Sequence, residues 1–317
     1  MLDVQTLNVF VEAALAQNFS VASRRLYLSQ PAVSLQIRNL EQYLGVELFE
    51  RNGRRVTLTP AGKLLLSQAQ GALRQLKQIE EIMQGLQGIV IGDLSIACST
   101  TVGKYVLPRL VAGFRQEHPD VRVTIDVMSR RAAVEWLLTS RADISVVSTR
   151  LQHSELELQP FLEDHVVLIV PAGHPWADGR TVRPEELYAV PFIQRETTAG
   201  TYQVVAEALT AHDLDIARLQ TVLTLASAEA IEMSVEAGIG AAFVSRLAAE
   251  RGMELARVVE VPVEDMTLTR TIYMVRHQRR PATPAHRAFW DFALHPASQP
   301  IRRLPAGSSP LKAGQAE

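Results

Sequence analysis

Residues 20–58 read SVASRRLYLSQPAVSLQIRNLEQYLGVELFERNGRRVTL, and the spacing within this stretch predicts two short helices followed by a hairpin. The second helix begins at Ser29, whose hydroxyl can accept a hydrogen bond from a free amide of the first turn. Pro31 fits that turn because its missing N–H would have no partner there. Gly45 favours the left-handed conformation that ends a helix. Four apolar residues at helical spacing predict one buried stripe, and these are Val33, Ile37, Leu40 and Leu44.

The opposite side of this helix carries amide, hydroxyl and guanidinium groups. Such groups bond base edges and phosphates in the major groove of DNA. They belong to Gln30, Ser34, Gln36, Arg38 and Asn39. We interpret the helix as the recognition helix of a helix-turn-helix unit.

The flanking segments support this interpretation. Upstream, we expect a short helix capped by Ser20, with Ala22 and Leu26 facing inward and a tight turn at residues 27–28. Downstream, Glu50 to Leu58 reads as a hairpin with an Asn52-Gly53 turn. Three arginines near the hairpin tip are expected to face phosphates, and these are Arg51, Arg54 and Arg55.

Each of these features is common by itself, since capped amphipathic helices and solvated arginine clusters occur in many proteins. Their order along one segment is what favours DNA binding. Residues 20–63 hold seven Lys or Arg against three Glu, a local balance of +4, whereas the whole chain of 317 residues carries −2. We therefore expect nucleic acid to be bound through a local basic patch.

Composition excludes several other classes of protein. One cysteine, Cys98, excludes a disulfide framework and a cysteine-based zinc finger; we expect it to be a small buried hydrophobe rather than a redox or nucleophilic thiol. The N-terminus does not resemble a secretory signal, and no apolar run approaches the ~20 residues that cross a bilayer. No Walker A, G-x-S-x-G or H-E-x-x-H motif is present. We expect a cytoplasmic protein that is not an enzyme, with no metal, no cofactor and no membrane partner.

A helix capped by Asp3 should complete a three-helix core, and Thr59-Pro60 should open a long helix running to about residue 87. Apolar residues in that helix follow an alternating spacing of four and three, which is typical of a coiled-coil seam. They are Leu65, Ala69, Ala72, Leu76, Ile79, Met83 and Leu86. The stripe either packs on the chain's own core or pairs two chains. We favour a dimer, which would present two recognition helices to two half-sites.

Beyond Gly88 strands alternate with helices, which indicates parallel α/β sheets. Two small doubly wound lobes account for the pattern better than one large sheet. We predict strands at 93–98, 121–128, 144–147, 166–170, 192–194, 219–225, 241–244 and 267–275, and helices at 102–117, 132–140, 200–211, 228–237 and 284–294. The Pro, Ser and Gly content from residue 296 onward predicts a disordered tail at 296–317.

Several hydroxyl side chains fall where strands end and helices begin, the place where open α/β sheets bind ligands. Free amides at a positive helix end would favour an anion. For any one of these residues, helix capping alone is the more economical explanation. Their convergence favours a ligand site made of Ser99, Thr100, Thr101, Thr149, Thr198, Thr201 and Ser227.

The chain resembles the LysR-type transcriptional regulators over about residues 2–295. The resemblance rests on LSQPAVSLQIRNLEQYLGVELFERNGRRVTLTPAG, TTVGKYVLPRLVAGFRQEHPDV, VPAGHPWA, RETTAGT and ASAEAIEMSVEAGIGAAFVS. It implies an α + α/β protein with a winged helix-turn-helix at 1–60 and a dimerising linker helix at 61–88. A two-lobed, periplasmic-binding-protein-like effector domain would follow at 89–295, with lobe I at 92–162 and 268–295 and lobe II at 163–267.

The resemblance also implies partners and roles. Such regulators bind promoter DNA as homodimers that assemble into homotetramers, act on RNA polymerase, and respond to a small co-inducer such as an organic acid or inorganic oxyanion. DNA contacts carry over to Gln30, Pro31, Ser34, Leu35, Arg38, Arg51, Arg54 and Arg55. Many relatives have arginine in place of Leu35, and the RETTAGTY segment departs from theirs at Ala199 and Tyr202. The STT-G-Y-LP variant at residues 99–108 resembles branches that regulate sulfur or carbon-fixation genes.

From these patterns we expect a ligand-responsive regulator that binds dyad-symmetric promoter sites. The alternative is a solute-binding protein using the same two-lobed fold, and the N-terminal basic unit counts against it.

Overall fold

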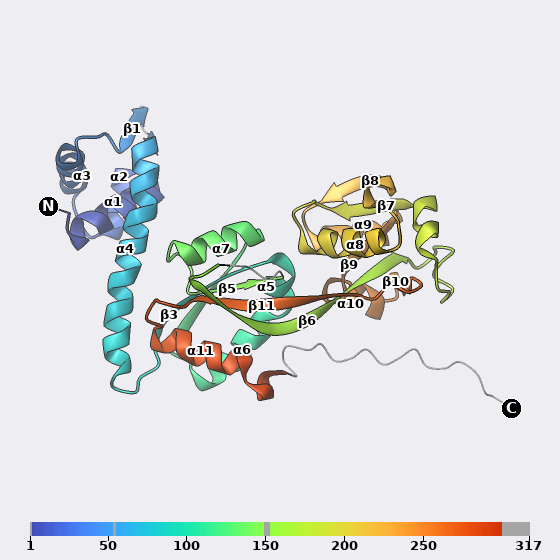
Figure 1. Cartoon of the computed structure of the whole chain (residues 1–317). Coiled ribbons are helices and arrows are strands. Elements are labelled where there is room, and N and C mark those ends of the chain that lie inside the picture. The colour runs from blue at the N-terminus through green and yellow to red at the C-terminus, as the bar shows by residue number, and fades with distance from the viewer. Residues whose placement is uncertain (1, 53–54, 149–152, 300–317) are drawn as a thin grey trace. The chain divides into compact units, whose positions relative to one another are not determined.

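The computed structural model describes residues 2–52, 55–148 and 153–299, apart from the side chains of 51, 52 and 55. Contacts divide the chain into two compact units, which we describe separately. The first, called the head, comprises residues 2–89 and 139–141. The second, called the effector unit, comprises residues 90–138 and 142–299 (Figure 1).

The head is a three-helix core with a two-stranded wing (Figure 1). Its elements are α1 (Val4–Ala16), α2 (Phe19–Arg25), α3 (Gln30–Leu44), β1 (Phe49–Asn52) and β2 (Arg55–Leu58). Phe49 at the start of the wing packs edge-on against Phe10 of α1, with ring centroids 5.6 Å apart, and against Phe19 of α2 at 5.3 Å. These aromatic contacts fix the wing against the helices. The expected stripe on α3 is confirmed for Val33, Ile37 and Leu40, which are buried, and Leu44 is partly buried against the same core.

Two local expectations for the head were wrong. Asn18 rather than Ser20 caps α2, because its Oδ1 accepts from the amides of Ser20 and Val21 at 2.9 and 3.1 Å. In the wing, Asn52 pairs with Arg55, so Asn52 ends the first strand instead of opening the turn. Gly53 and Arg54 lie outside the described residues.

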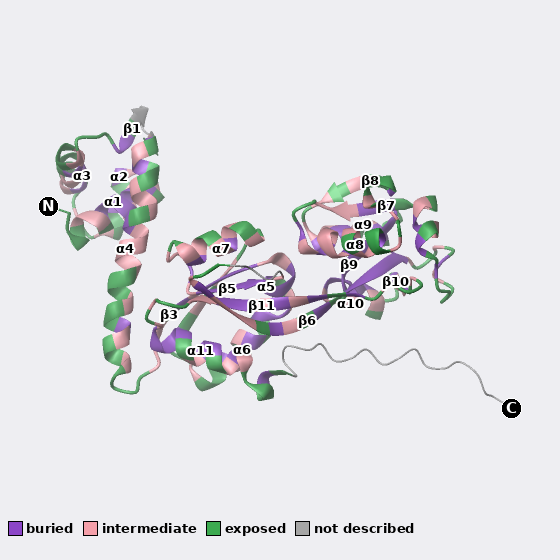
Figure 2. Ribbon diagram, viewed as in Figure 1, coloured by how far each residue is buried: buried purple, intermediate pink, exposed green. Residues whose placement is uncertain are grey.

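Helix α4 (Pro60–Gly85) begins at the expected Thr59 cap, whose Oγ1 accepts from the Gly62 amide at 3.0 Å. Its first half packs on the three-helix core of the head, where Ala69 is 2% exposed and Leu65 joins the same core. The four later positions of the predicted seam are open to solvent (Figure 2), and these are Leu76, Ile79, Met83 and Leu86. The open part of the stripe therefore starts at Leu76, and its role as a dimer seam stays a prediction.

The effector unit alternates strands and helices as predicted. The strands are β3 (Gly92–Cys98), β4 (Val121–Val127), β5 (Ile144–Val147), β6 (Leu156–Pro171), β7 (Pro191–Arg195), β8 (Gln220–Leu225), β9 (Ala241–Ser245), β10 (Val258–Val261) and β11 (Leu268–His277). The helices are α5 (Thr100–Tyr105), α6 (Leu107–Glu117), α7 (Arg130–Leu138), α8 (Gly200–Ala211), α9 (Ala228–Glu236), α10 (Arg246–Glu254) and α11 (Pro284–Leu294), with 3-10 helices at Pro184–Ala189, Ile216–Arg218 and Pro296–Ser298.

Several of these elements differ from the sequence expectation. The helix predicted at 102–117 is two helices that meet at Val106, followed by Pro108 in the first turn of the second. Helix α10 and strand β10 were not predicted, because short segments of nine and four residues give weak periodic signals. The predicted tail begins too early, since Ser298 is buried and its Oγ donates to the Phe292 carbonyl at 2.6 Å. Residues 300–317 lie outside the described part.

Within the described residues, nine strands form one hydrogen-bonded sheet in the order β4-β3-β5-β11-β6-β9-β7-β8, with β10 also paired to β6. The expectation of two separate parallel sheets was therefore wrong. Strands β6 and β11 pair antiparallel, with Val166 opposite Leu268 at one end and Leu156 opposite His277 at the other. This pair joins the two halves of the sheet. The strand predicted at 166–170 is only the C-terminal part of β6. Pro160 and the charged residues of the N-terminal part hide its strand pattern in the sequence.

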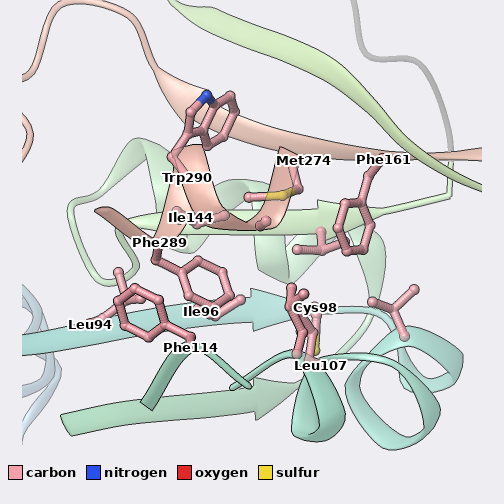
Figure 3. Close-up of a cluster of buried hydrophobic side chains, with 14 of the residues drawn as sticks. Leu94, Ile96, Cys98, Leu107, Phe114, Ile144, Phe161, Met274, Phe289 and Trp290 are labelled. Atoms are coloured by element: carbon pink, nitrogen blue, oxygen red, sulfur yellow. The ribbon is translucent and has the colours of Figure 1, made fainter. Parts of the chain in front are cut away.

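Two lobes nevertheless exist, because each half of the sheet has its own core. In lobe I, Leu94, Ile96 and Cys98 of β3 face α6 and α11, where Phe114 and Phe289 pack edge-on at 5.1 Å (Figure 3). In lobe II, alternate residues of β6 face opposite sides, which is the period of a strand. Val166, Leu168 and Val170 pack with α8, and Val167 and Ile169 pack with α9.

Candidate DNA-binding face and effector site

The exposed side of α3 presents most of the predicted base-reading groups (Figure 2). Gln30 and Arg38 are exposed and Ser34 is half-buried. The Gln30 Nε2 donates to Ser34 Oγ at 3.0 Å, a bond between residues one turn apart that orients both polar groups. Gln36 differs, because its Oε1 is buried and has no hydrogen-bond partner among the described residues. The reading face is thus polar, with Leu35 exposed within it.

The wing is attached to α3 by a residue that sequence reasoning missed. Glu41 Oε1 accepts from the backbone amides of Leu48 and Phe49 at 2.9 and 3.2 Å. These amides belong to the segment that enters β1, so the carboxylate sets where the wing leaves the helix. The pattern could have suggested it, since Glu41 is the one acidic residue in α3. The side chains of Arg51, Arg54 and Arg55 lie outside the described residues, so their contact with phosphates stays a prediction.

Ser99, Thr100 and Thr101 lie at the end of β3 and the start of α5, as predicted. The Ser99 amide donates to the Val146 carbonyl of β5 at 3.1 Å, and its side chain makes no capping bond. Thr101 is buried at 4% exposure, whereas Thr100 is half-buried. The neighbouring thiol of Cys98 is fully buried, and burial, together with the charge of Asp126, raises its pKa to about 12. The thiol stays protonated, which fits its expected role as a small hydrophobe.

A buried polar cluster lies where the two lobes share β6 and β11. Arg270 of β11 donates from Nε and Nη2 to Asp164 of β6 at 2.8 and 2.6 Å. Its Nη1 donates to Thr201 Oγ1 of α8 at 3.0 Å, and Ser245 of β9 donates to Asp164 at 2.5 Å. Thr201, predicted as an effector residue, is therefore held by the fold. Sequence reasoning missed Asp164 and Arg270, which are 106 residues apart and carry no local signal.

The first turn of α8 approaches the end of β5 closely. A methyl group at Gly200 would lie 2.4 Å from Ser148 Oγ and 3.1 Å from Arg270 Nη1. Only a glycine leaves room for this approach. The start of α8, which the exposed Thr198 precedes, thereby lies near the end of β5, where Thr149 was predicted to contribute. Thr149 itself lies outside the described residues.

Two further contacts bridge the lobes. Lys104 of α5 pairs with Glu229 in the first turn of α9, and Arg130 of α7 donates to Gln203 of α8 at 3.4 Å. Ser227 caps α9, with its Oγ accepting from the Ala230 amide at 3.4 Å. The Lys104 pair thus brings the Thr100 helix and the Ser227 helix together. Whether Ser99, Thr100 and Ser227 together bind an effector stays a prediction.

A small cavity of about 20 Å³ lies within lobe II, between α8, β7 and β9. It has room for little more than one water molecule. Phe192, Phe243 and Val205 form much of its wall, and Arg195 and Thr201 contribute polar atoms. Arg195 is held by a two-pronged pair with Glu196, at 2.9 and 3.0 Å. No helix among the described residues is long and apolar enough to span a membrane.

Sequence comparison with known families matches both units. Residues 4–63 match the bacterial regulatory helix-turn-helix protein of the lysR family, and residues 88–297 match the LysR substrate binding domain. A probable RuBisCO transcriptional regulator of Synechocystis sp. is 34% identical over 94% of this chain and 89% of its own length. The RuBisCO operon transcriptional regulator of Allochromatium vinosum is 32% identical over 96% of this chain and 99% of its own.

Solved structures share the fold. CbnR, a LysR family transcriptional regulator, superposes with a TM-score of 0.72 at 21% identity, covering 95% of this chain and 100% of its own. OxyR from Pseudomonas aeruginosa gives 0.69 at 23% identity, covering 92% and 94%. These relatives are regulators of transcription rather than enzymes. A polar-faced recognition helix with a wing, joined to a two-lobed ligand-binding fold, is the architecture of this family, and the chain belongs to the LysR-type transcriptional regulators.

Proposed function

We propose that the protein binds a dyad-symmetric promoter site through two copies of α3 and changes transcription when a small anion binds between the lobes of the effector unit. The observation that carries the proposal is the polar surface of α3, where Gln30 and Arg38 are exposed and Ser34 is half-buried, while Val33, Ile37 and Leu40 are buried. Hydrogen-bonding side chains on such a face can read base edges.

The exposed half of the stripe on α4 supports pairing of two chains. Leu76 is 41% exposed, Ile79 58%, Met83 59% and Leu86 76%, so four apolar side chains form a row without a partner in their own chain's core. A helix row of this kind is buried when two copies associate. The protein would then place two heads on DNA as a dimer, and two dimers as a homotetramer, in contact with RNA polymerase at the promoter.

The proposed effector is an organic acid or an inorganic oxyanion. Ser99 and Thr100 offer hydroxyls at the end of β3, Ser227 opens α9, and Thr198 precedes α8. The cations Lys104 and Arg130 stand at the same junction. Because the relatives at 32–34% identity are named as RuBisCO regulators, we propose that the genes controlled are those of carbon fixation.

The DNA-binding proposal is tested with the full-length protein and duplexes from upstream of its own gene and of RuBisCO genes. Arg38→Ala should weaken binding and relax the preference for one base pair of the site, as expected for one lost contact to a base edge. Gln30→Ala should also weaken binding, whereas Gln42→Ala, an exposed glutamine at the far end of the same helix, should not. Equal effects of the two glutamine variants, or no binding at low salt, would contradict the proposal.

The effector proposal is tested by thermal shift with inorganic phosphate, sulfate and small mono- and dicarboxylates. A bound ligand raises the unfolding temperature by mass action. Thr100→Val should lose the shift and keep DNA binding, and Thr124→Val, which changes an exposed threonine on edge strand β4, should keep both. Loss of DNA binding in Thr100→Val would show that this threonine is structural.

A further inference from the structure

Leu35 occupies an unusual position on α3. The other apolar side chains of the helix's middle are buried, with Val33 at 0%, Ile37 at 1% and Leu40 at 3% exposure. Leu35 is 55% exposed. With 3.6 residues per turn, two residues correspond to roughly 200° of rotation, so Leu35 lies almost opposite Val33. Its side chain therefore points away from the head's core and to the centre of the reading face.

The neighbours of Leu35 on this face are polar or small. Residues three and four apart on a helix are adjacent, so Pro31, Arg38 and Asn39 surround Leu35, and all three are exposed. On one side lies the hydrogen-bonded pair of Gln30 and Ser34. The head also exposes two tyrosines, but neither lies beside Leu35. Tyr27 is in the turn before α3, and Tyr43 is near the C-terminal end of α3. Leu35 is thus an apolar group framed by hydrogen-bonding groups.

In the major groove of DNA one base offers an apolar partner to such a side chain, the C5-methyl group of thymine. The amide and guanidinium groups around Leu35 would bond neighbouring base edges, and an isobutyl group between them cannot. Placed over an amino group or a ring nitrogen, the leucine would remove water from a polar atom and return no hydrogen bond. The favourable match is a methyl group.

We propose that Leu35 reads the methyl group of one thymine in each half-site of the operator. This inference rests on the proposed binding of DNA through α3 and adds a specificity-determining residue to it. The gain is the contact of two apolar surfaces brought out of water, worth about a four-fold change in affinity for one methyl-sized group.

The experiment replaces thymines by deoxyuridine, one position at a time, in a duplex that the full-length protein binds. The two bases differ only by the methyl group, so all hydrogen bonds to the base edge are kept. We expect one thymine in each half-site at which the replacement weakens binding about four-fold. The unsubstituted thymine duplex of the same sequence is the reference for each replacement.

Protein variants then assign the effect to the leucine. Leu35→Ala should bind the thymine and deoxyuridine duplexes with equal affinity, and Leu35→Val should keep part of the difference. Tyr43→Ala removes another exposed apolar side chain of α3 and should keep the full four-fold difference. A difference that persists in Leu35→Ala, or the absence of any sensitive thymine in a duplex that is bound, would overturn the proposal. Failure to bind any duplex would instead refute the proposed function.

Discussion

The head and the effector unit use polar side chains in different ways. Among the described side chains of residues 2–59, the buried polar ones are Ser23 and Thr59, which donate to the backbone carbonyls of Ser20 and Glu47. The effector unit instead buries an ion pair, Asp164 with Arg270, and a histidine, His286, with an Nε2 that has no partner among the described residues. The three-helix core and wing of the head thus bury few polar side chains, whereas in the effector unit buried polar side chains hold distant segments together.

The difference explains why function is easier to read from the head's sequence. A helix with a buried stripe exposes its other face by geometry alone, so Gln30 and Arg38 could be placed from spacing. A buried ion pair depends on which strands become neighbours, which spacing within a segment does not reveal. Substitutions of equal chemistry should therefore have unequal effects in the two units.

The largest effect is expected from Arg270→Met. Removing one partner leaves the Asp164 carboxylate, which is fully buried, without its counter-charge, and this costs about 3–5 kcal/mol. The chain's three tryptophans, Trp136, Trp176 and Trp290, all lie in the effector unit, so tryptophan fluorescence follows its unfolding in urea. The matched control is Arg257→Met, which breaks the more exposed pair with Glu236 and should cost less than about 1 kcal/mol. Similar costs for both would show that burial does not decide how much an ion pair of the effector unit contributes to stability.

The next effect concerns pH. Burial, with smaller contributions from Arg276 and Arg287, lowers the pKa of His286 from 6.5 to about 4. As pH falls below 6.5 the unfolded chain takes up a proton that the folded chain does not bind until about pH 4. Stability of the effector unit should therefore fall between these values, by on the order of 3 kcal/mol. The change is measured by urea unfolding at several pH values.

His286→Phe provides the comparison for that titration. Phenylalanine can keep the edge-on contact with Trp290 and cannot bind a proton. The backbone amide of residue 286 would still be capped by Thr283. Stability of this variant should depend less on pH between 4 and 6.5 than that of the unchanged protein. An unaltered dependence would mean that carboxylates and not His286 cause it.

A smaller effect is expected from Gly200→Ala, which tests how closely the lobes approach. The new methyl group would meet Ser148 Oγ, and relieving this overlap should cost about 1–3 kcal/mol of stability in the effector unit. Gly173→Ala is the control, because a methyl group there meets nothing within 4 Å. The double variant with Ser148→Ala should recover part of the loss. DNA binding by the head should be retained in all three, and its loss would show that the overlap is not confined to the lobes.

The smallest effect is expected in the head, from Asn18→Ala. Losing the cap of α2 costs about 1 kcal/mol. Hydrogen exchange of residues 19–25 in the full-length protein should accelerate about five-fold. Ser20→Ala should leave exchange nearly unchanged, because the Ser20 side chain is exposed and caps nothing. Faster exchange in Ser20→Ala than in Asn18→Ala would show that Ser20 is the cap of α2.

Much of the fold was predictable because its signals are local. As expected, Ser29 and Thr59 cap the starts of α3 and α4, and Gly45 ends α3. The buried stripe of α3 followed from the spacing of its apolar residues. What could not be predicted was long-range pairing. Residues 156–165 gave no strand pattern of their own, and their extended form depends on β11, which lies more than a hundred residues later. Likewise, the boundary between a predicted strand and a predicted helix placed Ser99 and Thr100. The hydrogen bond that holds Thr201 comes from Arg270, and no pattern near Thr201 in the sequence reveals it.

The shared strands β6 and β11 have a mechanical consequence. The twist between neighbouring strands varies over a wide range, so a pair of strands that belongs to both lobes is expected to change its twist while it keeps its hydrogen bonds. The register of this pair is interrupted by the bulge between Ile272 and Tyr273, where it skips Phe161. Phe161 is inserted into the core of lobe I, so a rotation of lobe II would be transmitted to that core as a displaced aromatic ring.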